Sequence, residues 1–454
     1  MGDRSDRADH RSIPMLMPPL PPSLASLLVW LRPCFTAPTF ATFTGLLVGF
    51  LAQTGRRTVT GMLAGARLQQ TWSHYRAYRF FARARWSADQ LGLRLADLAV
   101  RLLVAPGVPI RVAVDDTLMR RSGRKVFGAA WHHDPLAAGQ RRTAWGNCWV
   151  VAGILVDLPF LAHRSVCLPV LARLWQPKQL GSKPALAREL VDLLAARFGD
   201  RQLHLVADAG YAASALAGLD PTQVTVTVRP RADAALYGLA PPRTGRPGRP
   251  RVKGPRLGSI AEVADDPATN WQPATLTRYG KTATVDLTSR TCLWYGTFGK
   301  QPVRLVLVRE RPATRCYDLA LITTDLITDP ATLVERYASR WSLEVTFEAA
   351  RQDAGVGQAR NRTRQAVERT IPFELACFSL AIIWYATAGQ PAVDLARRRA
   401  HAPWYATKHA VSVADMLAAF RRALIATQYR AGQQLTPTPT QTLEVQAAWA
   451  AAGL

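Results

Sequence analysis

Two apolar runs that end in aspartates constrain the fold of this chain more than any other feature. The first run covers 110–114 and is followed by Asp115 and Asp116, and the second covers 203–207 and is followed by Asp208. Runs of this length that are bounded by polar residues are typical of buried β-strands. In open α/β sheets, ligands bind beyond the carboxyl ends of the strands. We therefore expect a sheet with acidic side chains gathered at one edge.

The pattern around these runs predicts a mixed α/β fold. Three early strands, one helix and two more strands follow one another, and a mixed sheet covered by helices is the usual result of such an order. The predicted helix lies near 185–198, and the predicted strands are 110–115, 148–155, 161–168, 204–207 and 224–228.

The charge balance indicates a polyanionic partner. The 454 residues include 57 Lys and Arg against 32 Asp and Glu, a formal net charge of +25. An excess of this size speeds encounters with nucleic acid and releases counterions on binding. The chain has no Cys-x-x-Cys pair, no phosphate-binding Gly-x4-Gly-Lys loop and no apolar run near the ~20 residues of a membrane span. We expect a cytoplasmic protein without a membrane partner, a zinc ribbon or an intrinsic ATPase.

The segment 331–353 has helical spacing and carries a polar face. Tyr337, Arg340, Glu344 and Arg351 recur at intervals of three, four and seven residues, which places them on one side of a helix. A neighbouring apolar stripe is expected to dock this helix on the sheet, and it consists of Val334, Ala338, Trp341, Val345 and Ala349. A glutamate on a helix and two aspartates at strand ends form a hard-oxygen set suited to Mg²⁺.

In combination, these motifs resemble the DDE transposases of bacterial insertion sequences, in the cut-and-paste group marked by Tyr-x2-Arg-x3-Glu-x6-Lys. Tyr337, Arg340 and Glu344 match that motif, and Arg351 stands where the family has lysine. The dipeptide Asp116-Thr117 resembles the family's first aspartate. The segment 206–211, Val-Ala-Asp-Ala-Gly-Tyr, resembles the context of its second. The resemblance covers about 105–390.

The resemblance implies an RNase H-like core and a two-metal nuclease. Asp116, Asp208 and Glu344 would be catalytic and would hold two Mg²⁺ ions about 4 Å apart, with Mn²⁺ as a substitute. Tyr337, Arg340 and Arg351 would contact DNA. The implied partners are the inverted-repeat ends of a transposon, target DNA and a second copy of the chain in a homodimer. The setting would be the bacterial cytoplasm, near the nucleoid.

Composition and hydrophobic pattern divide the chain into segments. We expect a helical N-terminal DNA-binding domain, with a plain helical subdomain as the alternative, and a core split in two by a β-rich insertion. The segments are a flexible tail at 1–38, the N-terminal domain at 39–105, the core at 106–230 and 318–400, the insertion with a basic loop at 231–317, and a helical C-terminal segment at 401–454.

Three residue assignments have rivals in the sequence. Asp115 competes with Asp116, because adjacent strand residues point to opposite faces and only one should reach the metals. Glu348 competes with Glu344 one helical turn away. The stretch 245–251 resembles an AT-hook that would place arginines in a minor groove, and the alternative is a basic loop that touches only phosphates. Its candidate DNA-binding residues are Arg246, Arg249 and Arg251.

The leading hypothesis is therefore a metal-dependent transposase that cleaves transposon ends and transfers strands. One alternative is an inactive or domesticated descendant that binds DNA without cutting it. Another is a different RNase H-like nuclease, such as a resolvase.

Overall fold

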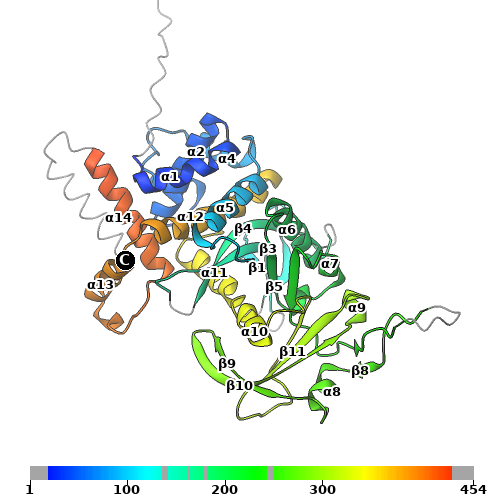
Figure 1. The fold of residues 1–454 in the computed structure, drawn as a ribbon. Coiled ribbons are helices and arrows are strands. Elements are labelled where there is room, and N and C mark those ends of the chain that lie inside the picture. Colours follow the sequence, from blue (N-terminus) through cyan, green and yellow to red (C-terminus); the bar gives the residue numbers. More distant parts are fainter. Residues whose placement is uncertain (1–18, 135–141, 162–163, 178–180, 243–249, 432–454) are drawn as a thin grey trace, which may run out of the picture.

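A ten-stranded mixed sheet lies at the centre of the fold. The structure is a computed structural model, and it describes residues 19–134, 142–161, 164–177, 181–242 and 250–431. The strands run in the order β2-β3-β1-β5-β6-β12-β11-β10-β9, and β4 pairs with β3 beside this path. Helices lie on both faces of the half that contains β1 (Figure 1). The mixed α/β class expected from the sequence is therefore confirmed.

The half around β1 (Ile110–Arg120) combines antiparallel and parallel pairing. β2 (Ala130–His133), β3 (Thr143–Asp157) and β4 (Ser165–Trp175) are antiparallel to their neighbours, whereas β5 (Leu203–Ala207) and β6 (Val224–Val228) run parallel to β1. This arrangement is compatible with an RNase H-like core. It places the middle of β1 beside the carboxyl end of β5, because their ladder ends at Val114 and Ala207.

The segment expected to be a β-rich insertion supplies strands that extend the same sheet. β6 pairs with β12 (Leu319–Thr323), and β11 (Val303–Arg309), β10 (Lys281–Cys292) and β9 (Gln272–Arg278) follow in order. Between β6 and β9 lie the short ribbon of β7 (Leu236–Tyr237) and β8 (Arg256–Gly258) and the helix α8 (Ile260–Asp265). The link from β6 to β12 is narrow, because its register contains only the pairs Val228–Ile322 and Thr227–Thr323.

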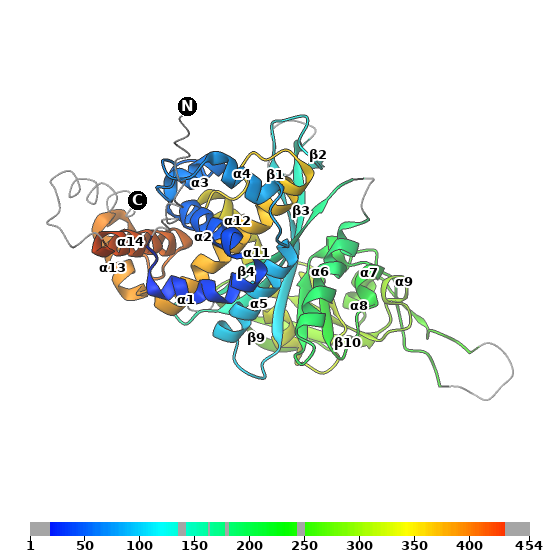
Figure 2. The same ribbon diagram turned by 90° about the horizontal axis from the view of Figure 1, so that it is seen from above.

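Helices cover the two faces of the β1 half (Figure 2). One face carries α5 (Ala88–Leu103), α11 (Trp341–Gln352) and α12 (Arg364–Ala388). The other carries α6 (Lys183–Arg197), whose Ser182 hydroxyl caps the first turn by accepting the N–H of Ala185. The shorter α7 (Ser214–Ala217) and α9 (Tyr295–Phe298) lie near the extended part of the sheet.

The N-terminal helices pack on α12 through a cluster of phenylalanine rings. These helices are α1 (Pro22–Leu31), α2 (Ala37–Ala52), α3 (Val59–Gly65) and α4 (His74–Ala82). Phe43, Phe80 and Phe81 meet the ring of Phe373 with centroids 5.8, 5.7 and 5.3 Å away. Much of the aromatic content of this region therefore serves the core. The expected loose tail at 1–38 is wrong for 22–31, because α1 buries four leucines against the other helices.

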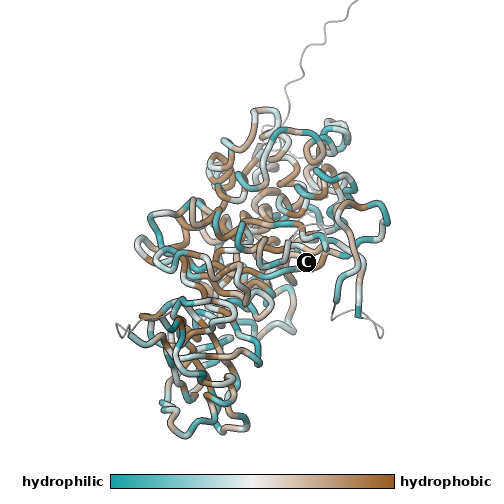
Figure 3. Tube along the Cα trace, turned by 90° about the vertical axis from the view of Figure 1, so that its right-hand side faces the viewer, coloured by the Kyte–Doolittle hydropathy of each residue, from teal (hydrophilic) through white to brown (hydrophobic). Residues whose placement is uncertain are grey.

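The C-terminal part continues as α10 (Pro330–Ala338), α13 (Pro391–His401) and α14 (Val413–Ala431). The hydrophobic stretches of the trace concentrate in the helices and strands of the interior, and polar stretches mark the turns (Figure 3). By length and composition alone, α12 could cross a membrane, but 78% of its most apolar stretch is buried inside the protein. Such burial is the environment of a core helix.

Candidate active site

The register of the parallel pair β1–β5 brings Asp115 beside Asp208. The last pair of the ladder is Val114 with Ala207, so Asp115 and Asp208 are the next residues on each strand. Neighbouring strands lie about 4.8 Å apart, and residues at one register position point to the same face of a sheet. The acidic edge expected from the two apolar runs therefore forms around Asp115 and Asp208.

Arg340 joins Asp115 to Glu344 from the helical side. Its Nη1 atom lies 3.0 Å from Oδ2 of Asp115, and its Nη2 atom lies 2.8 Å from Oε1 of Glu344. The expected single helix over 331–353 is broken here, because α10 ends at Ala338 and α11 begins at Trp341. The break directs Arg340 toward the strand end, while Glu344 follows in the first turn of α11.

Burial and like charges shape the electrostatics of this cluster. Burial, reinforced by the nearby Asp208 carboxylate, raises the pKa of Asp115 to about 7, against the stabilising N–H of Asp116 and the attraction of Arg340. Burial alone would lower the pKa of Arg340, but Tyr337, Asp115 and Glu344 together raise it. The site thus concentrates negative charge that one arginine only partly offsets.

Asp116 lies on the opposite face of β1. Its Oδ2 atom is 2.7 Å from Nζ of Lys183 at the start of α6, and its Oδ1 accepts the hydroxyl of Tyr211 at 3.2 Å. The thiol of Cys148 also donates to Oδ2, at 3.3 Å. Among the contacts of Asp116 in the described residues there is none with Arg340 or Glu344, and the expectation that Asp116 is catalytic stays a prediction. Strand alternation sends Asp115 and Asp116 to different faces.

Tyr337 and Arg351 extend the site along α10 and α11. Burial raises the pKa of Tyr337, whose ring centroid lies 5.8 Å from the guanidinium carbon of Arg340. Arg351 donates from Nη1 to the hydroxyl of Thr117, 2.7 Å away. Thr117 lies two residues beyond Asp115 on the same face of β1, so Arg351 is further along the strand than Arg340.

The expectation of which apolar residues dock the 331–353 segment on the sheet is wrong for part of α11. Trp341 and Val345 are about half exposed, whereas Leu343 and Phe347 are the buried anchors. The break before α11 rotates its buried face relative to α10. Glu348, the rival of Glu344, is exposed and accepts a hydrogen bond from Gln352, so it faces away from the cluster.

The expected basic loop is described only in part. Arg246 and Arg249 lie outside the described residues, and Arg251 is exposed beyond the ribbon of β7 and β8. The contribution of this loop to DNA binding stays a prediction.

The two carboxylates that Arg340 pairs with, together with the neighbouring Asp208, fit a divalent metal by donor chemistry. Asp115, Asp208 and Glu344 offer hard oxygen ligands of the kind that Mg²⁺ prefers. The Arg340 guanidinium stands between two of them and takes the place of a cation. Within the described parts of the chain, no three Asp, Glu, His or Cys side chains are close enough to hold an ion in the present conformation.

The contact between Lys183 and Asp116 was not expected from the sequence, nor was the proximity of Asp115 to Asp208. For Asp115, the signal was available in the spacing of the two apolar runs. Aligning them as parallel neighbours ending at Ala207 and Val114 pairs Asp208 with Asp115. Lys183 gave no comparable signal, because it lies 67 residues from Asp116 in the sequence.

Comparison with known protein families gives a match. A family model described as DDE superfamily endonuclease matches residues 31–300, which is more than half of the chain and includes both aspartate-bearing strands. The match ends before Arg340 and Glu344, so the placement of those residues rests on the structure. No curated protein matches the chain.

Proposed function

We propose that this chain, which belongs to the DDE superfamily endonucleases, is a DNA transposase that cleaves transposon ends and joins them to target DNA. One observation carries the proposal. Asp115 and Asp208 directly follow the last pair of the parallel β1–β5 ladder, and Arg340 links Asp115 to Glu344 on the helix that faces them. An acidic cluster at strand ends, paired with an arginine that can hold phosphate oxygens, suits chemistry on a phosphodiester.

We assign Asp115 rather than Asp116 as the first acidic residue of the centre. Asp115 shares a face with Asp208 and an arginine with Glu344. Asp116 is engaged behind the strand by Lys183, Tyr211 and Cys148. That engagement supports a positioning role, because the N–H of Asp116 also donates to Oδ1 of Asp115 at 2.8 Å.

Each residue of the site would have a role that follows from the chemistry of its side chain. Asp115, Asp208 and Glu344 would hold Mg²⁺, or Mn²⁺ in its place, and the metal when bound supplies Lewis acidity for in-line attack on phosphorus. Arg340 would exchange its carboxylate partners for oxygens of the scissile phosphate, since its planar fork suits either anion. Tyr337 orients Arg340 by packing beside its guanidinium. Arg351 would grip backbone beyond the cleaved bond.

The proposed partner is double-stranded DNA, first as transposon ends and then as target. A net charge of +25 favours a polyanion, and the basic loop with Arg246, Arg249 and Arg251 would add contacts away from the centre. A homodimer would bring two ends together for joining.

Isosteric substitutions of the neighbouring aspartates test the proposal. Asp115→Asn should reduce Mg²⁺-dependent nicking of supercoiled plasmid by about 1000-fold, since losing several kcal/mol of charge stabilisation costs tenfold per 1.4 kcal/mol. Glu344→Gln should behave alike. Asp116→Asn should reduce nicking by about tenfold, at the lower end of the roughly 10- to 100-fold effect that the hydrogen-bonding partners of metal ligands commonly have.

Duplex binding in EDTA serves as the folding control, because it needs the arginines but not the carboxylates. Wild-type nicking by Asp115→Asn would refute the assignment. Wild-type nicking by both Asp115→Asn and Glu344→Gln would refute the nuclease centre itself. For transposition as such, a donor plasmid with the repeats that flank the gene should yield excised and joined products, and cleavage without joining would leave only an endonuclease.

A further inference from the structure

An arginine-lined cavity of about 540 Å³ lies at the far end of β1 from the carboxylates. Three separate segments build it: the loop between α2 and α3, the turn after β1, and the loop between α11 and α12. The lining residues include five arginines and no Asp or Glu, and the arginines are Arg56, Arg120, Arg121, Arg360 and Arg362. A cavity with this lining is built for an anion rather than for an apolar ligand.

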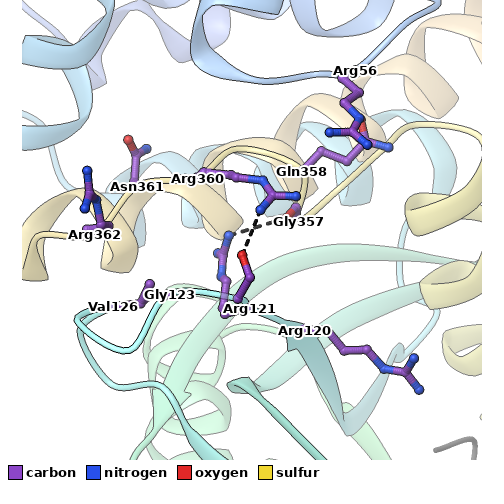
Figure 4. Close-up of a pocket in the computed structure, with 11 residues that line it drawn as sticks. Arg56, Arg120, Arg121, Gly123, Val126, Gly357, Gln358, Arg360, Asn361 and Arg362 are labelled. Atoms are coloured by element: carbon purple, nitrogen blue, oxygen red, sulfur yellow. Dashed lines mark hydrogen bonds between the residues drawn. The ribbon is translucent and has the colours of Figure 1, made fainter.

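The arginines of the cavity differ in how fully they are engaged. Arg120 turns away to pair with Asp134 at 2.7 Å, whereas Arg360 reaches in and donates to the hydroxyl of Ser122 at 2.9 Å (Figure 4). Arg56 and Arg362 are exposed, and neither forms an ion pair within the described residues. The positive charges of Arg56 and Arg362 therefore remain available to an anion bound in the cavity.

Arg121 forms part of the cavity wall and has donor capacity to spare. It donates from Nε to Asn147 at 3.0 Å and from Nη1 to the carbonyl of Ala359 at 2.6 Å. Its buried Nη2 atom finds no acceptor in the described part of the chain. An unsatisfied buried donor is unfavourable, so a phosphate oxygen that reached this atom would be stabilising.

The cavity is tied to the acidic centre by one strand and one helix. Arg340 contacts Asp115, Arg351 contacts Thr117, and Arg121 contacts the loop that follows α11. α11 and its loop thus run alongside β1 from the carboxylates to the cavity. Positive φ at Gly355 and Gly357 lets this loop turn back onto β1, where Gly357 abuts the side chain of Met119.

We propose that this cavity binds the phosphate backbone of the DNA substrate away from the cleaved bond. The proposal rests on the proposed function, because it takes the acidic cluster as the point of cleavage. Arg120 lies five positions after Asp115 on β1, which corresponds to about 17 Å of strand. Phosphates along one DNA strand are about 3.4 Å apart along the helix axis, so the contact would fall about five nucleotides from the reacting phosphate.

Removal of the two unpaired arginines at the mouth tests the proposal. Arg56→Ala combined with Arg362→Ala should weaken binding of a fluorescent duplex of arbitrary sequence, measured by anisotropy in EDTA. The slope of log K against log salt should fall by about 1.8, since each lost phosphate contact contributes about 0.9. Neither side chain is buried, so the double variant should fold normally.

A charge-matched control separates the cavity from net charge. Lys300 and Arg315 are exposed and lie outside the cavity, so Lys300→Ala with Arg315→Ala removes the same charge. We expect this control to leave the salt slope near the wild-type value. An equal fall in both double variants, or no fall in the cavity variant, would overturn the proposal.

A second measurement distinguishes a DNA backbone from a free anion. Calorimetric titration with inorganic phosphate should show at most weak binding to the wild-type cavity. Tight phosphate binding that the cavity variant loses, together with an unchanged DNA salt slope, would assign the cavity to a small anion and refute the DNA contact. Because binding is measured in EDTA, this failure is distinct from failure of the nuclease centre, which the Asp115 and Glu344 variants report through nicking.

Discussion

Glu374 should make the stability of this protein fall as the pH rises from acid to neutral. Its side chain lies at the middle of α12 with no exposed surface. One oxygen accepts the N–H of Gly357 at 2.6 Å, and the backbone N–H of Ala359 also stabilises the charged carboxylate. Burial raises the pKa of Glu374 from 4.5 to about 8, although the N–H of Gly357 and the charge of Arg121 act in the opposite direction.

The direction of the change in the free energy of unfolding with pH is set by proton binding to Glu374. Between the unfolded pKa of 4.5 and the folded pKa of about 8, the folded protein holds a proton that the unfolded chain has lost. The free energy of unfolding should therefore fall by about 1.4 kcal/mol per pH unit, or about 3 kcal/mol between pH 5 and pH 7. With an unfolding entropy of about 2.1 cal/mol/K per residue, this loss corresponds to a Tm decrease of about 3 °C for a chain of this length.

Glu374→Gln isolates this contribution. The amide is uncharged at every pH, and its oxygen can still accept the N–H of Gly357. Thermal unfolding of both proteins from pH 5 to pH 8 should show the variant gaining on wild type as pH rises, with the difference levelling off above pH 8. Parallel pH profiles would refute the reasoning, because they would mean that Glu374 titrates alike in the folded and unfolded chain.

Three further outcomes follow from contacts described above. Arg351→Lys keeps the charge but loses the planar donor to Thr117, so it should retain most DNA affinity. Arg351→Ala should weaken assembly on DNA more than it slows single-turnover cleavage in assembled complexes. A larger loss in cleavage than in assembly would place Arg351 at the scissile phosphate. Lys183→Met should lower the free energy of unfolding by about 1 kcal/mol in urea titrations and leave nicking largely intact, unless Asp116 is itself catalytic. Phe373→Ala should cost about 3–5 kcal/mol in the same titrations, and a loss below 1 kcal/mol would show that the rings around it do not couple the N-terminal helices to α12.

Local pattern was enough to predict the strands that build the acidic edge. The apolar runs before Asp115 and Asp208 became β1 and β5, and 224–228 became β6 with the expected bounds. The helix expected near 185–198 is α6. These elements are fixed by short-range hydrophobic periodicity, which a single sequence displays directly.

Features that depend on pairing between distant segments could not be predicted in the same way. The choice between Asp115 and Asp116 depends on the β1–β5 register, and the continuity of one sheet depends on β6 meeting β12 nearly a hundred residues later. The arginine cavity draws on residues such as Arg56 and Arg360 that are some three hundred positions apart. In each case the sequence contains suitable residues, but it does not indicate which of them are in contact in the folded protein.

The narrow β6–β12 link has a consequence for the order in which this protein matures during synthesis. Asp115 and Asp208 can come together as soon as β5 has left the ribosome and paired with β1. Glu344 and Arg340 become available only after roughly 136 further residues, which take about 7–27 s to add at 5–20 residues per second. They also depend on β9–β11 having folded, because β12 contacts β6 through two register pairs and β11 through five. A nascent chain would therefore spend that interval with its acidic pair assembled and its arginine partner absent, and a truncated product would carry the first half of the centre without the second.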